Sequence, residues 1–148
     1  MSLKSAILED VKSAMRAGEK LRLKTLRMVT AAIKQREVDE RIELDDTQVL
    51  AILEKMIKQR RESAEAYRAG DRPELADVEE AEIAVLQTYL PEPLSDDELD
   101  AMIDQALAAN DAQGMAAMGP VMAVLKTQAQ GRADMREVSK RVRARLQA

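Results

Sequence analysis

Two prolines, Pro91 and Pro93, interrupt a chain that is otherwise patterned for helices. A proline cannot continue a helix, because its ring removes an amide donor and restricts the residue before it. Elsewhere, Leu, Ile, Val, Met and Ala recur at helical spacing. The chain has no Phe or Trp, two tyrosines, and no alternating run of strand-favouring residues. The sequence therefore predicts an all-α protein with a break at these prolines.

Four helices are expected before the break. Ser2 is a suitable N-cap for the first, Gly18 and Gly70 are suitable ends, and Pro73 fits the first turn of the fourth. The expected ranges are residues 3–17, 19–40, 46–69 and 73–90. Within the second helix one stripe is basic and typical of a solvated surface; it contains Lys20, Lys24, Arg27 and Lys34.

Three helices are expected after the break. Ser95 and Glu98 are spaced as a capping box, and Asp134 is expected to cap the last helix in the same way. The expected ranges are residues 96–110, 120–130 and 135–148. We therefore expect an N-terminal four-helix domain over residues 1–91 and a C-terminal three-helix tail domain over residues 92–148.

The composition limits the chemistry that this chain can perform. With no Cys and no His, it has no thiolate, no imidazole base and none of the usual nitrogen or sulfur ligands for a metal. Its glycines are scattered singly, so no phosphate-binding loop is present. Ser63 and Lys58 could be imagined as a nucleophile and its base, but no glycine-rich oxyanion turn lies near them. We expect no catalytic residue, no metal and no cofactor.

The compartment is predicted from the absence of targeting patterns. We find neither the charged and apolar parts of a signal peptide nor an apolar run long enough to cross a bilayer. These absences predict a cytoplasmic protein with no membrane partner.

Charge is distributed unevenly although the net charge is −4. Residues 71–112 contain 13 acidic residues and 1 basic residue, whereas residues 113–148 contain 7 basic and 2 acidic ones. The basic tail is a candidate contact surface for an RNA phosphate backbone. Because it has no aromatic residue, it is not expected to stack on bases. A merely solvated basic helix face is the alternative. The candidate RNA-binding residues are Lys126, Arg132, Arg136, Lys140, Arg141, Arg143 and Arg145.

Several segments, in order along nearly the whole chain, resemble the YqeY family, also called the GatB/YqeY-like family. They are Leu26-Arg-Met28, Ala31-Ala-Ile33, Lys58-Gln-Arg-Arg-Glu-Ser63, Glu79-x-x-Glu-Ile83, Tyr89-Leu-Pro91, Met118-Gly119-x-x-Met122 and Gly131-Arg-Ala-Asp134. The resemblance implies a helical N-terminal domain and a three-helix tail similar to that of the B subunit of glutamine-dependent aspartyl/glutamyl-tRNA amidotransferase. It also implies a role directed at tRNA or associated with the amidotransferase, because that tail helps to recognise tRNA.

Three functional hypotheses follow. The first is a non-catalytic accessory protein that binds tRNA or another structured RNA through the basic tail. The second is a protein-interaction module that docks on a partner enzyme, with an interdomain or partner surface formed by Lys58, Arg60, Arg61, Glu62 and Ser63. The third is a carbon–nitrogen ligase with glutamine as amido donor, for which the chain offers no recognisable catalytic residues.

Overall fold

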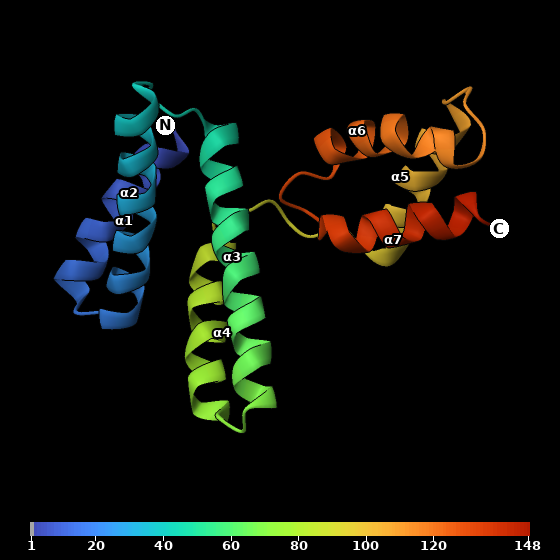
Figure 1. The fold of residues 1–148 in the computed structure, drawn as a ribbon. Helices are drawn as coiled ribbons and strands as arrows, with labels where there is room; N and C mark the ends of the chain where they lie inside the picture. The colour runs from blue at the N-terminus through green and yellow to red at the C-terminus, as the bar shows by residue number, and fades with distance from the viewer. Residues whose placement is uncertain (1) are drawn as a thin grey trace. The chain divides into compact units, whose positions relative to one another are not determined.

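The computed structural model describes residues 2–148, and within them it contains helices and no strand (Figure 1). The prediction of an all-α fold is confirmed. The helices are α1 (Leu3–Ala17), α2 (Lys20–Glu40), α3 (Asp46–Ala69), α4 (Pro73–Gln87), α5 (Asp96–Ala108), α6 (Met118–Gln128) and α7 (Met135–Leu146), with a short 3₁₀-helix, η1 (Gly114–Ala117), before α6. None of the described helices has the length and apolarity needed to span a bilayer.

Side-chain caps set the starts of several helices. The Ser2 hydroxyl accepts a hydrogen bond from the Ser5 amide at the start of α1. Asp45 and Ser95 form reciprocal capping boxes with the third residues of α3 and α5. Gly18 ends α1 with φ of 70°, a left-handed conformation that costs glycine little. These caps are local in the sequence; at the start of α1, Asp46 Oδ1 of α3 also accepts a hydrogen bond from the Leu3 amide at 2.8 Å.

The chain divides into two compact units, of which the first ends at Leu90 and the second is Pro91–Ala148. Each has its own buried apolar cluster. The first is centred on Ile7, Leu26, Val29, Val49, Leu53 and Leu86. The second is centred on Ile103, Val121, Leu125, Val138 and Val142. Independent folding of the two units as domains stays a prediction.

Two helical hairpins make up the first unit. α1 lies beside α2 and α3 beside α4, and α2 also contacts α3 and α4 (Figure 1). The Tyr89 hydroxyl, just after α4, donates a hydrogen bond to Asp10 Oδ2 of α1 at 2.5 Å. Burial, and then this hydrogen bond, raises the pKa of Tyr89 above its ordinary value. The contact joins two segments that are 79 residues apart in the sequence.

Glu37 connects α1 with the segment after α2. Its Oε2 accepts hydrogen bonds from Lys4 Nζ at 2.8 Å and from the Leu44 amide at 2.9 Å. These bonds, that of Lys4 first, lower the pKa of the Glu37 carboxyl. The contact therefore favours the ionised carboxylate in the folded protein.

Glu37→Gln is expected to lower the melting temperature at pH 7 and to have little effect in acid. A group whose pKa is lowered by folding stabilises the protein above its unfolded pKa, which is about 4.3 for glutamate. This contribution is lost as pH falls through the lower folded pKa. Thermal unfolding of both proteins between pH 7 and pH 3 measures the difference. A gap in melting temperature that stays constant down to pH 3 would contradict the assignment.

In the second unit, the residues after the proline break are fastened to the turn that follows α6. The Leu94 amide donates to the Arg132 carbonyl oxygen at 2.8 Å. In return, Arg132 Nε donates to the Glu92 carbonyl oxygen at 2.9 Å. Arg132 therefore anchors this extended segment with both its backbone and its side chain.

Candidate functional site

The seven basic residues of the second unit fall into two groups in the structure. Arg132, Arg141 and Arg145 are half-buried and bonded to groups of the same unit. The other four are exposed to solvent: Lys126, Arg136, Lys140 and Arg143. The basic tail therefore does not form one uniform contact surface.

Arg141 and Arg145 hold α7 against α5. Arg141 Nη2 lies 2.7 Å from Asp96 Oδ1, and its Nη1 lies 3.1 Å from Asp100 Oδ1. Arg145 pairs with Asp100 at 3.2 Å and also with Asp104. The hydrogen bond to Asp96, followed by that to Asp100, raises the pKa of the Arg141 guanidinium. Both cations are thus largely compensated by the acidic face of α5 and are poorly suited to hold a phosphate.

Arg132 has a similar structural position. Besides its bond to the Glu92 carbonyl, its Nη2 lies 3.8 Å from Glu98 Oε2. The Arg132 side chain is therefore anchored to the segment that contains the prolines, and Glu98 partly compensates its charge.

The exposed cations of α7 lie on one face. Arg136, Lys140 and Arg143 are spaced four and three residues apart, which aligns them along a helix. Lys126 lies in the last turn of α6. The nearby Asp134 carboxylate caps α7 by accepting from the Arg136 amide at 2.9 Å. We call Arg136, Lys140 and Arg143 the α7 basic face. All three of its side chains are exposed to solvent.

The segment proposed as a partner surface lies on α3, and its residues point in different directions. Lys58, Arg61 and Glu62 are exposed and Ser63 is half-buried. Arg60 is buried, with 7% of its surface exposed, and so contributes no charge to an outer surface. The segment is consequently a mixture of core and surface.

Arg60 forms a buried ion pair with Glu82 of α4, which is 5% exposed. Its Nε donates to Glu82 Oε2 at 2.8 Å. Its Nη1 donates to the Met56 carbonyl at 3.3 Å, and its Nη2 contacts Met28 Sδ at 3.4 Å. Lys24 Nζ approaches Glu82 Oε1 at 3.7 Å. The pair therefore connects α3, α4 and α2, and its chemistry is that of a structural link.

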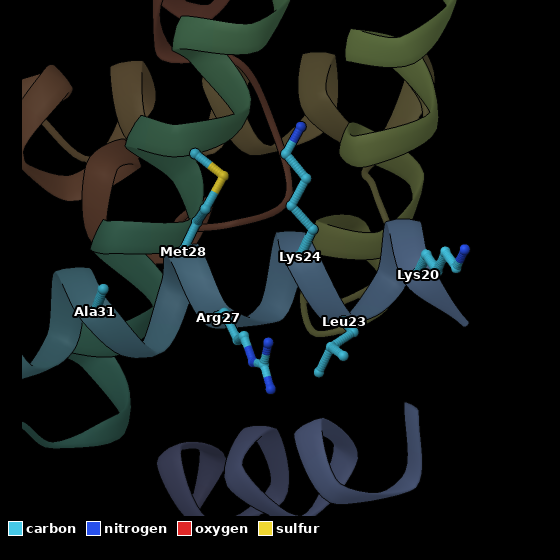
Figure 2. Close-up of a pocket in the computed structure, with 6 residues that line it drawn as sticks. All are labelled: Lys20, Leu23, Lys24, Arg27, Met28 and Ala31. Atoms are coloured by element: carbon cyan, nitrogen blue, oxygen red, sulfur yellow. The ribbon is translucent and has the colours of Figure 1, made fainter. Parts of the chain in front are cut away.

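A groove runs along the exposed side of α2 (Figure 2). Its volume is about 510 Å³, and its lining residues are Lys20, Leu23, Lys24, Arg27, Met28 and Ala31. We call it the α2 groove. Leu23 and Arg27 point toward the α1 side of the helix, while Lys24 and Met28 point toward α3 and α4 (Figure 2). A second hollow of about 590 Å³ begins at Arg27 and Ala31 and continues along α1 and α2.

The basic part of this groove was visible in the sequence as a solvated stripe. The sequence did not reveal that apolar residues on the same face, such as Met28, stay exposed beside these cations.

No cluster of three or more acidic side chains that could hold a metal ion occurs within residues 2–148.

Comparison with known proteins gives a family and several relatives. The family described as "Yqey-like protein" matches residues 4–146. A protein of Pyrenophora tritici-repentis named "Altered inheritance of mitochondria protein 41, mitochondrial" is 31% identical over 136 residues, which cover 90% of this chain and 75% of that protein. A protein of the same name from Vanderwaltozyma polyspora is 34% identical over 102 residues, or 67% of this chain. That match spans only 55% of the Vanderwaltozyma protein, a little over half its length.

These relatives correct the expected compartment. They are named as mitochondrial proteins, so the prediction of a cytoplasmic protein is wrong. The prediction was drawn from missing targeting patterns. Lack of a secretory signal argues only against secretion, and the folded body of a protein does not record which compartment receives it.

Proposed function

The chain belongs to the Yqey-like protein family, and from that premise we propose that it is a non-catalytic accessory protein that binds the phosphate backbone of structured RNA, such as tRNA. The contact surface is the α7 basic face together with Lys126. The observation that carries the proposal is that Lys140 and Arg143 are exposed on α7, whereas Arg141 and Arg145 are paired with carboxylates of α5.

A row of cations without aromatic residues suits a backbone rather than bases. Lysine and arginine bind phosphates through charge and hydrogen bonds, and the release of counterions drives the association. Reading of unpaired bases uses stacking side chains, which this unit lacks. Binding is therefore expected to depend on RNA shape and salt, with little dependence on sequence.

tRNA is the favoured RNA because the tail resembles the tRNA-recognising tail of the amidotransferase B subunit. Association with such an enzyme belongs to the same proposal, whereas ligase chemistry within this chain lacks a residue to perform it. The relatives' names give a mitochondrial inheritance trait and no reaction, so the proposal depends on the surface of this chain.

Lys140→Ala combined with Arg143→Ala is expected to weaken binding to bulk tRNA by about tenfold at low salt. Since two phosphate contacts are removed, the slope of log K against log salt should become shallower by about two. Fluorescence titration of the full chain at several salt concentrations measures both quantities.

The matched control removes two exposed lysines of the first unit, Lys12 and Lys55, and changes the net charge equally. It is expected to bind tRNA as the parent protein does. Absence of binding at low salt, or an equal loss in the control, would contradict RNA recognition by α7.

A further inference from the structure

The α2 groove has no role in RNA binding by α7, and it lies in the other compact unit. Its lining residues follow one another at spacings of three, one, three, one and three, which places them on a single face of the helix. From Lys20 to Ala31 this face extends about 16 Å, or three turns. The groove is therefore as long as a short helix that could lie along it.

The floor of the groove is apolar. It consists of Leu23, Met28 and Ala31. Leu23 lies on the α1 side with Arg27, whereas Met28, which is 43% exposed, lies with Lys24 on the side of α3 and α4 (Figure 2). Leu8, which is 46% exposed, lines the adjoining hollow. Exposed apolar side chains that lie next to one another are typical of a binding site, whereas isolated ones are common anywhere on a surface.

The rim of the groove is cationic and mostly uncompensated. Lys20 and Arg27 form no ion pair within the residues that the structure describes. Lys24 approaches Glu82, but that carboxylate is already bonded to Arg60. The rim thus presents positive charge to whatever occupies the floor.

These two properties favour one kind of occupant. A nucleic-acid backbone would use the cations and leave the apolar floor exposed. A purely apolar helix would cover the floor and bury the cations without partners, which is costly. An amphipathic helix with apolar anchors at i, i+3 or i+4 and i+7, flanked by carboxylates, matches both. We propose that the α2 groove is a docking site for an acidic amphipathic helix of a partner protein.

The test uses the full chain and a synthetic probe. The probe is a fluorescent helical peptide of about four turns with leucines at the anchor positions and flanking glutamates. Anisotropy titration is expected to show binding that weakens as salt is raised. Arg27→Glu should weaken it at least about tenfold, because a rim attraction becomes a repulsion. Lys55→Glu, an equal charge reversal at an exposed site on α3, should leave it unchanged.

A second pair of variants tests the floor without changing charge. Ala31→Gln places a longer polar side chain in the groove and is expected to weaken peptide binding about fivefold, whereas Ala66→Gln on α3 should have no effect. Both positions are exposed and helical, and glutamine is a good helix former, so folding is retained.

Several results would overturn the proposal. One is equal binding of a scrambled peptide or of a peptide with lysines in place of glutamates. A second is displacement of the peptide by bulk tRNA accompanied by loss of tRNA affinity in Arg27→Glu, which would make the groove an RNA surface. A third is self-association of the chain abolished by Arg27→Glu, which would make the occupant a second copy.

Discussion

Glu82→Leu is expected to lower the free energy of unfolding by roughly 3–5 kcal/mol. The substitution leaves the buried Arg60 guanidinium without its carboxylate, with the Met56 carbonyl and Met28 sulfur as its remaining contacts. A buried charge that loses its partner carries the full cost of its removal from water. Urea denaturation followed by circular dichroism measures the change.

The double variant Arg60→Met with Glu82→Leu is expected to recover most of this stability, since replacing both members of a buried pair by apolar side chains is often neutral or stabilising. Lys24→Met supplies the control. The Lys24 side chain is 66% exposed and 3.7 Å from Glu82, so its loss should cost under about 1 kcal/mol. A double variant that is as unstable as Glu82→Leu would show that the ion pair itself is needed for the packing of α2, α3 and α4.

Ile103→Ala is expected to destabilise the second unit by about 2–5 kcal/mol and to leave the first unit folded. Ile103 is fully buried in the cluster formed by α5, α6 and α7, which shares no residue with the cluster of the first unit. Hydrogen exchange followed by mass spectrometry separates the two responses. Peptides from α5 to α7 should lose protection while those from α1 to α4 keep it.

Leu26→Ala is the reciprocal variant. Leu26 is fully buried in the first cluster. Its truncation to alanine should reduce protection from hydrogen exchange in α1 to α4 and leave α5 to α7 protected. Loss of protection throughout the chain in either variant would show one cooperative unit and would contradict independent domains at residues 1–91 and 92–148.

Helix positions could be predicted from sequence because their signals are local. Ser2, Ser95 and Asp134 cap the helices that they were expected to cap. The fourth helix ends at Gln87, three residues before its predicted end, and the amides of residues 88–90 instead donate to carbonyls three residues back. Pro91 has no amide with which to continue the helix by bonding the Gln87 carbonyl. The 3₁₀-helix at Gly114–Ala117 was not predicted, since one short turn has no periodicity to detect.

The candidate sites were only partly predictable because ion pairing depends on packing. The tail cations are plain in the sequence, but Arg141 meets Asp96 across 45 residues and Arg145 meets Asp104 across 41. Arg60 was assigned to a surface since arginine is seldom buried. Its partner Glu82 is 22 residues away on another helix, and no local pattern announces the pair.

The positions of the tyrosines have a consequence for how this protein can be observed. Tyr67 lies in α3 and Tyr89 just after α4, so the whole near-ultraviolet signal arises from the first unit. The second unit is optically silent in that range. In an alkaline titration the Tyr89 phenol should ionise above its ordinary range, because burial and the hydrogen bond to Asp10 raise its pKa. The spectrum of Tyr89 thus reports on the contact between α1 and the end of α4. Events on the α7 basic face can be followed only with an added chromophore.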